Sequence, residues 1–169
     1  MPKSPPSNYA DIGDTGEDLV AQWLKSTGWE ILHRRFSCRW GEIDIIAQYH
    51  DTKETANKQT TNHQNSILAF VEVKTRSSGS WDAGGRNAIT PQKQAKLCHT
   101  AGIFLAQYPE KADYSCRFDV AIVFCQRLPK NVVKDIVTPQ TLASLSIPGY
   151  EFKLLEYIPA AFDLSTINW

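Results

Sequence analysis

Two short runs, GEIDIIA at 41–47 and FVEVKTR at 70–76, constrain the fold more than any other part of the sequence. Each is an apolar run of strand length with charged side chains inside it. A charge inside an apolar strand costs free energy unless it pairs, binds a metal ion or takes part in chemistry. The two runs therefore predict strands of a buried sheet with a polar site on them.

The alternation of side chains along a strand predicts which of these charges share a surface. In the second run, Glu72 and Lys74 are neighbours on one face, roughly 6.6 Å apart at about 3.3 Å per residue. If the two runs pair as adjacent strands about 4.8 Å apart, Asp44 joins them on that surface. In the first run, the expected faces are Ile43, Ile45 and Ala47 on one side and Glu42, Asp44 and Ile46 on the other.

Two carboxylates beside a lysine are suited to phosphodiester hydrolysis. Carboxylates hold a divalent cation that keeps several waters, and a lysine can orient or help to deprotonate one of them. The alternative is a structural salt bridge between Glu72 and Lys74, because an isolated Glu-x-Lys pattern carries little information. Glu151 and Lys153 repeat the pattern and are interpreted as ordinary strand alternation. The first copy differs because Asp44 precedes it on a strand of its own.

The composition is that of one globular domain. The chain has 169 residues, of which 42% are hydrophobic and 21% charged, enough for a single core. No apolar stretch approaches the roughly 20 residues of a membrane span, and the first residues lack the apolar segment of a signal peptide. We therefore expect a cytoplasmic protein without a membrane partner. Residues 1–9, rich in Pro and Ser, are expected to be disordered, and 10–169 to form the domain, with a polar hairpin insertion at about 50–66.

Charge and cysteine content exclude some classes of protein. The formal net charge is zero, which weighs against a strongly basic protein that coats DNA. Basic residues nevertheless accompany the two central runs, which predicts either a basic surface around an acidic pocket or an evenly mixed surface. The four cysteines show no zinc-site spacing, so structural thiols are favoured over a metal site.

The first helix is expected to begin between Ile12 and Thr15 and to end at Gly28, which suits the left-handed position beyond a helix end. Glu17 falls at the edge of its apolar face. Two interpretations stay open for Glu17: a carboxylate that complements the helix dipole, or a third acidic group at the rim of the core.

A second helix is expected from Thr90, as N-cap, and Pro91 to about Tyr108. It follows the third strand and precedes a fourth, so a parallel pair with a right-handed crossover is predicted. The other expected elements are strands at 29–36, 41–48, 70–76 and 116–125, loop with short turns at 126–149, and an edge strand at 150–157.

The sequence also gives expectations for polar side chains outside the acidic site. Arg117 and Asp119 are neighbours on one strand face and are expected to pair. Four basic or amide side chains near the central runs are either phosphate contacts or ordinary surface residues: Arg76, Gln92, Lys93 and Lys96.

The order of these elements, with Asp44 on the second strand and Glu72-Val73-Lys74 on the third, resembles the PD-(D/E)XK, or restriction-endonuclease-like, nucleases. More closely, the chain is similar to the YraN-like family within that superfamily. The matching stretches are GEDLVAQWL at 16–24, GWEILHRRF at 28–36, the two central runs, the helix with Lys93, RFDVAIV at 117–123 and IPAAF at 158–162.

The resemblance implies a mixed α/β fold: an αβββαβ core whose sheet is flanked by helices. It implies that Asp44 and Glu72 are ligands of Mg²⁺, with Mn²⁺ as a substitute, and that Glu17 completes the acidic cluster. Lys74 would orient the attacking water and stabilise charge on the phosphate. The chain departs from the superfamily in its insertion at 50–66 and in Ile43, where the superfamily's pattern has proline.

Three functions remain open at this point. The first is a magnesium-dependent nuclease acting on DNA, including branched or structured DNA, and a two-fold homodimer would suit a double-stranded substrate. The second is a nucleic-acid-binding module that keeps the fold without cleaving. The third is a structural or protein-interaction domain whose charged strand residues only pair with one another.

Overall fold

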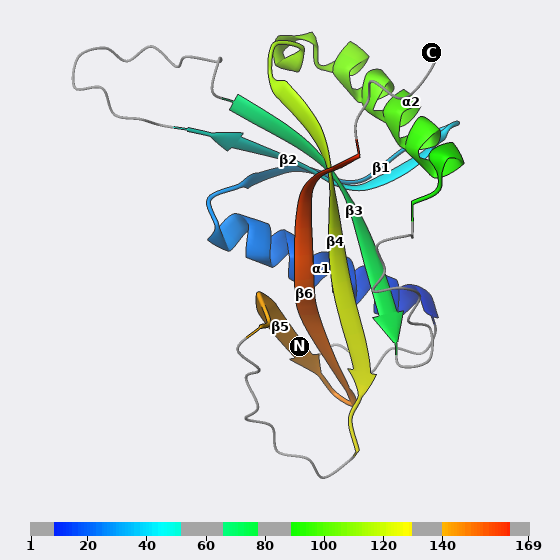
Figure 1. The fold of residues 1–169 in the computed structure, drawn as a ribbon, viewed down its shortest axis with the longest axis vertical. Helices are drawn as coiled ribbons and strands as arrows, with labels where there is room; N and C mark the ends of the chain where they lie inside the picture. Colours follow the sequence, from blue (N-terminus) through cyan, green and yellow to red (C-terminus); the bar gives the residue numbers. More distant parts are fainter. Residues whose placement is uncertain (1–8, 52–65, 78–88, 130–139, 163–169) are drawn as a thin grey trace, which may run out of the picture.

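The computed structural model describes residues 9–51, 66–77, 89–129 and 140–162, which form two α-helices and a six-stranded sheet (Figure 1). The strand order is β1-β2-β3-β4-β6-β5. The elements are α1 (Tyr9–Ser26), β1 (Glu30–Cys38), β2 (Gly41–His50), β3 (Ser66–Ser77), α2 (Pro91–Gln107), η3 (Pro109–Lys111), β4 (Ser115–Arg127), β5 (Ala143–Ile147) and β6 (Tyr150–Phe162).

The sheet is mixed, as predicted. β1, β2 and β3 form an antiparallel meander, and β3 and β4 are the parallel pair, connected through α2. β6 then pairs antiparallel with both β4 and β5. The predicted αβββαβ core with its flanking helices is therefore confirmed.

The two helices cover opposite faces of the sheet (Figure 1). Leu19 and Leu24 of α1 pack on Val71 and the other inward residues of one face. Leu97 and Phe104 of α2 pack on the other face, in a cluster rich in phenylalanine. Each such side chain contributes about 1.5–3 kcal/mol when fully buried, so both helices are held firmly against the strands between them.

The helix boundaries follow from local chemistry. Thr90 caps α2 by accepting a hydrogen bond from the Lys93 amide at 3.2 Å, as predicted. α1 begins at Tyr9, earlier than expected, and the Thr15 hydroxyl donates to the Asp11 carbonyl inside the helix. Gly28, with φ 95°, follows the helix end as predicted.

The expectations for the C-terminal part were wrong in one respect. β5 lies within the segment expected to be loop, and it, not β6, is the edge strand of that side of the sheet. Alternate residues of β5 pack on the α1 side, so a short half-exposed strand completes the sheet.

Several expectations concern parts of the chain outside the described residues. The N-terminus that was expected to be disordered falls almost wholly there, as does the expected polar insertion, although β2 ends at His50 and β3 begins at Ser66, close to its expected limits. Among the residues described, no helix is long and apolar enough to cross a membrane.

Candidate active site between strands β2 and β3

The predicted site lies where β2 and β3 part. Their ladder runs from His50 opposite Ser66 to Ile45 opposite Val71. Beyond that pair, β1 and β2 turn towards α2 while β3 continues beside β4 (Figure 1). At the parting point Val73 donates its amide proton to Asp44 Oδ2 at 2.7 Å. The Asp44 side chain thus takes a hydrogen bond on β3 just where the backbone ladder stops, and this fixes its carboxylate.

The face prediction for β2 was wrong at one residue. Ile45 packs in the α1 cluster as one face requires, but Ile43 packs with Ile46 in the α2 cluster. The strict alternation is therefore broken at Asp44. On β1, the residue at the same level is Arg35, which has φ 53°, a left-handed conformation uncommon for a non-glycine residue. Both strands change course beside the site, which is why a two-residue period did not predict it.

Glu72 is the most buried charged group of the site, with a side chain 6% exposed. Its Oε1 atom lies 3.0 Å from Lys74 Nζ and 3.3 Å from Lys93 Nζ. Its Oε2 atom is also buried, yet has no hydrogen-bond partner among the described residues. One oxygen is thus compensated by two cations and the other by none, an arrangement that is uncommon in proteins and typical of ion-binding and catalytic sites.

A cavity of about 230 Å³ opens beside these groups. It is bounded by α1, the N-terminal half of β2 and the C-terminal half of β3. Lys93 reaches the site through its ion pair with Glu72, whereas Gln92 and Lys96 are exposed on α2 and do not line the cavity. The predicted residues that line it together are Glu17, Asp44, Glu72, Lys74 and Arg76.

Glu17 reaches the cavity from α1, and arginines of β1 hold it there. Its Oε2 lies 2.9 Å from Arg35 Nε and 3.6 Å from an Arg34 nitrogen. Burial raises the pKa of Glu17, while the bond from Arg35 opposes the rise. The second interpretation of Glu17, an acidic group at the rim of the core, is the one that the geometry favours, but its charge is already shared with two arginines.

The helix carrying Glu17 is seated directly on β3. A Cβ added at Gly16 would lie 2.1 Å from Thr75 Oγ1, too close for any side chain without movement. The Thr75 hydroxyl is buried by this contact and has no hydrogen-bond partner in the described part of the chain. Only glycine allows α1 to approach β3 this closely.

The two central carboxylates repel one another. The pKa of Asp44 is raised from 3.8 to about 7, first by burial and then by the charge of Glu72, while the Val73 amide opposes the rise. Near neutral pH Asp44 is therefore poised between its two protonation states. A cation at this position would relieve the repulsion and favour the ionised form.

Asp44 and Glu72 fit a divalent cation such as Mg²⁺. They supply hard oxygen ligands, a buried Glu72 oxygen without a hydrogen-bond donor, and a negative charge that lacks full compensation. No group of three or more His, Cys, Asp or Glu side chains in the described ranges is arranged to hold a metal ion. Two carboxylates are nevertheless enough for Mg²⁺, which commonly completes its shell with water and substrate phosphate.

Fold and site together define a class: the αβββαβ sheet, with an acidic residue at the parting end of β2 and Glu-Val-Lys on β3, is a restriction-endonuclease-like core. The chain belongs to the family described as Uncharacterised protein family UPF0102, the YraN-like group, whose model matches residues 16–123.

Curated relatives from cyanobacteria support this assignment. A UPF0102 protein of Trichormus variabilis is 58% identical over 92% of this chain and 97% of its own length. One from Trichodesmium erythraeum is 48% identical over 92% and 91% of the two chains. One from a Synechocystis strain is 41% identical over 90% and 97%. The similarity therefore extends over nearly the whole of each protein.

Sequence reasoning missed three partners of the site. Lys93 was expected to be either a phosphate contact or an ordinary surface residue, not a partner of Glu72, and Arg34 and Arg35 were not connected with Glu17. The signal for the arginines was present, because acidic residues crowd one helix and the two arginines lie on the next strand. The pairing of Lys93 depends on how α2 crosses the sheet, which local sequence does not determine.

Proposed function

We propose that this protein is a divalent-metal-dependent nuclease that hydrolyses phosphodiester bonds of DNA. The observation that carries the proposal is the buried Glu72 oxygen without a hydrogen-bond donor, beside Asp44 with its raised pKa, in a cavity between parting strands. Glu151 Oε2 is also buried without a hydrogen-bond donor among the described residues, but Lys153 Nζ lies 3.9 Å from that same oxygen, whereas both lysines at Glu72 lie at its other oxygen, Oε1. This argues against the third function, in which the charged residues only pair.

Each residue has a definite role in this proposal. Asp44 and Glu72 hold the cation, and the Val73 amide keeps the Asp44 carboxylate in place. A bound Mg²⁺ would polarise the phosphate and lower the pKa of a bound water. Lys74 lines the same cavity and is oriented by its 3.0 Å contact with Glu72, so its ammonium can donate to the attacking water or to a phosphate oxygen. Lys93 offsets part of the Glu72 charge when the site is empty.

A second candidate is a nucleic-acid-binding module that keeps the site without cleaving. It is favoured by the cations already around the acidic groups: Lys74 and Lys93 at Glu72, and Arg34 and Arg35 at Glu17. Such compensation weakens metal binding. This module would bind DNA in a salt-dependent manner, and binding would survive Asp44→Ala.

The test is a titration of the purified protein with Mg²⁺ and with Mn²⁺, in which the Tm of thermal unfolding is measured at each metal concentration. A ligand at 100 times its Kd stabilises by about 2.7 kcal/mol, which corresponds to several degrees in Tm for a domain of this size. We expect the wild type to show this rise and both Asp44→Ala and Glu72→Ala to lose it. Duplex and branched DNA are then incubated with wild type and Asp44→Ala.

The outcomes separate the two candidates. Cleavage that requires the metal and is lost in Asp44→Ala supports the nuclease. Cleavage by Asp44→Ala at the rate of wild type, in preparations free of contaminating nuclease, would overturn the site. DNA binding by both proteins, with no cleavage and no metal-dependent rise in Tm, would favour the binding module.

A further inference from the structure

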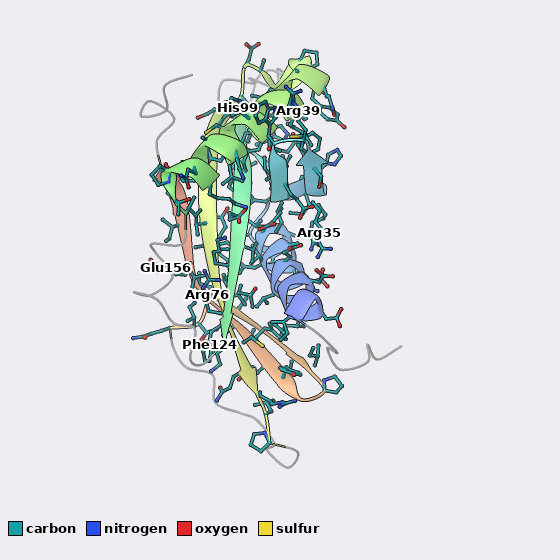
Figure 2. The ribbon with its side chains drawn as sticks, turned by 90° about the vertical axis from the view of Figure 1, so that its right-hand side faces the viewer. Arg35, Arg39, Arg76, His99, Phe124 and Glu156 are labelled. Atoms are coloured by element: carbon teal, nitrogen blue, oxygen red, sulfur yellow. The ribbon has the colours of Figure 1, made fainter. Side chains whose placement is uncertain are left out.

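An exposed aromatic stack lies on the turn between β1 and β2. Trp40 is 39% exposed, and its ring stacks on His99 of α2 with centroids 4.8 Å apart and planes 23° apart. The Arg39 guanidinium carbon lies 4.7 Å from the centroid of the same ring. Figure 2 shows Arg39 and His99 close together beside α2. A tryptophan exposed to this extent is not explained by the core.

The turn that carries the stack is tied to α2. The Trp40 amide donates to Cys38 Sγ at 3.4 Å, and Cys38 Sγ lies 3.5 Å from Thr100 Oγ1. The Thr100 hydroxyl in turn donates to the Lys96 carbonyl at 2.8 Å. These bonds fix the turn against α2, and the Trp40 ring itself is held by its stack on His99, which reduces the side-chain entropy to be lost when a ligand binds.

The stack is close to the candidate active site along both elements. Trp40 lies in the turn that leads into β2, four residues before Asp44, a span of about 13 Å at ~3.3 Å per residue. His99 follows Lys93 by six residues of α2, about 9 Å at ~1.5 Å per residue. These spans correspond to about three or four stacked nucleotides at ~3.4 Å per step. One strand of DNA could reach both places.

The charges around the stack suit a phosphate backbone. Arg39 and Lys96 are exposed on the two elements that meet there. Within the described residues, Arg39 forms no salt bridge with a carboxylate, so the ring of Trp40 is its principal partner. When a base joins the stack, this guanidinium is available for a phosphate oxygen.

We propose that the stack of Arg39, Trp40 and His99 binds an unpaired base of the DNA substrate. This inference rests on the proposed function and names the substrate class: DNA that carries an unpaired stretch a few nucleotides from the scissile phosphate. The geometry that supports it is an exposed, immobilised indole beside two cations, which is the combination that binds single-stranded bases by stacking without sequence preference. Fully paired DNA buries its base faces and gains nothing from the stack.

The experiment compares two probes that have the same phosphates. One is a DNA duplex with a single-stranded overhang of natural bases, and the other is the same duplex with abasic sugars in the overhang. Binding is measured by fluorescence anisotropy at fixed salt, with Asp44→Asn present in every protein to prevent cleavage. The proteins are this background alone and with Trp40→Ala, Trp40→Phe or Trp40→Leu. Leu142→Ala serves as the control, since Leu142 is 47% exposed just before β5 on the far edge of the sheet.

We expect the background protein to prefer natural bases by about 5- to 140-fold, the range that one base–aromatic stack supplies. Trp40→Ala and Trp40→Leu should lose that preference, Trp40→Phe should keep most of it, and Leu142→Ala should leave it unchanged. Thermal unfolding shows that each variant is folded. A preference that survives in Trp40→Ala, or no preference in the background protein, would overturn the stack while leaving the nuclease proposal intact. Failure to bind any DNA would overturn both.

Discussion

Two buried acidic sites in this molecule are built in opposite ways. Asp119 on β4 has a fully buried side chain, and each of its oxygens has donors. Its Oδ2 accepts from the Tyr157 hydroxyl at 2.6 Å and from Arg117 at 3.1 Å, and its Oδ1 accepts from the Ala160 amide at 2.9 Å. At the parting of β2 and β3, Glu72 has a buried oxygen with no such donor in the described structure.

The difference distinguishes a carboxylate whose two oxygens both have donors from one with a buried oxygen that has no donor among the described residues. Around Asp119, burial and the neighbouring charge raise the pKa of Tyr157, so this side chain remains a hydrogen-bond donor at all working pH values. Around Asp44, burial and Glu72 raise the pKa of the carboxylate itself. The first site stabilises its charge with protein donors, whereas at the second the described residues supply no donor to the buried Glu72 oxygen.

The largest expected effect is at the compensated site. Asp119→Asn keeps the volume but removes the charge that Arg117 pairs with, and it replaces one acceptor oxygen by an NH2 donor that faces existing donors. Breaking a buried pair in this way should lower the free energy of unfolding by about 3–5 kcal/mol. Urea unfolding of wild type and variant measures this change. An effect within 1 kcal/mol of wild type would show that the Asp119 network is not structural.

The same substitution at Asp44 should raise the free energy of unfolding of the metal-free protein instead of lowering it. Because the folded pKa is raised from 3.8 to about 7, the stability that protonation contributes is complete below pH 4 and is lost as pH rises through 7. Asp44→Asn lacks this loss, so above pH 7 it should be more stable than wild type by on the order of 1–4 kcal/mol. Near pH 4 the two should agree. Urea unfolding in chelator between pH 4 and 8 checks both ends, and parallel profiles would contradict the assigned pKa.

A smaller effect is expected when only one donor of the Asp119 network is removed. Tyr157→Phe deletes the hydroxyl that lies 2.6 Å from Asp119 Oδ2 but keeps the ring that packs on Trp23. The expected loss of unfolding free energy is about 1.5 kcal/mol, that of a hydrogen bond to a charged group. The metal-dependent rise in Tm should remain, because Tyr157 does not line the acidic cavity. If that rise disappears, the two sites are coupled.

The smallest effect is expected at the second Glu-x-Lys of the sequence. Lys153 Nζ lies 3.9 Å from Glu151 Oε2 on β6, away from Asp44. Glu151→Gln should therefore leave the metal-dependent stabilisation within about 0.5 kcal/mol of the wild-type value, the range of substitutions remote from a site. Thermal unfolding with and without Mg²⁺ measures it. If Glu151→Gln lost as much metal-dependent stabilisation as Glu72→Ala, the assignment of the metal to Asp44 and Glu72 would be wrong.

Much of the fold and the composition of the cavity could be predicted from the sequence because they depend on local patterns. Thr90 followed by Pro91 specified the start of α2, and the charged apolar runs specified β2 and β3. Alternation placed Glu72 and Lys74 on one face, and the 3.0 Å contact between them confirms it. Arg117 and Asp119 likewise pair, as their spacing predicted.

The remaining features depend on how distant elements meet. The break in alternation at Asp44 arises because β2 turns away with β1 while β3 stays with β4, and no residue of β2 alone encodes that choice. Lys93 pairs with Glu72 only because α2 crosses the sheet at this level. β5 was missed because a five-residue, half-exposed strand has too few buried residues to stand out from a loop.

The close seat of α1 on β3 has a consequence for how related sequences can change. Any side chain at position 16 collides with the Thr75 hydroxyl, so the two positions cannot vary independently. A homologue with alanine at the first position should lack the hydroxyl at the second, whereas each change alone would shift the helix or leave a gap. We therefore expect positions 16 and 75 to covary. The position of the helix that carries Glu17 then depends on both residues together, not on either one alone.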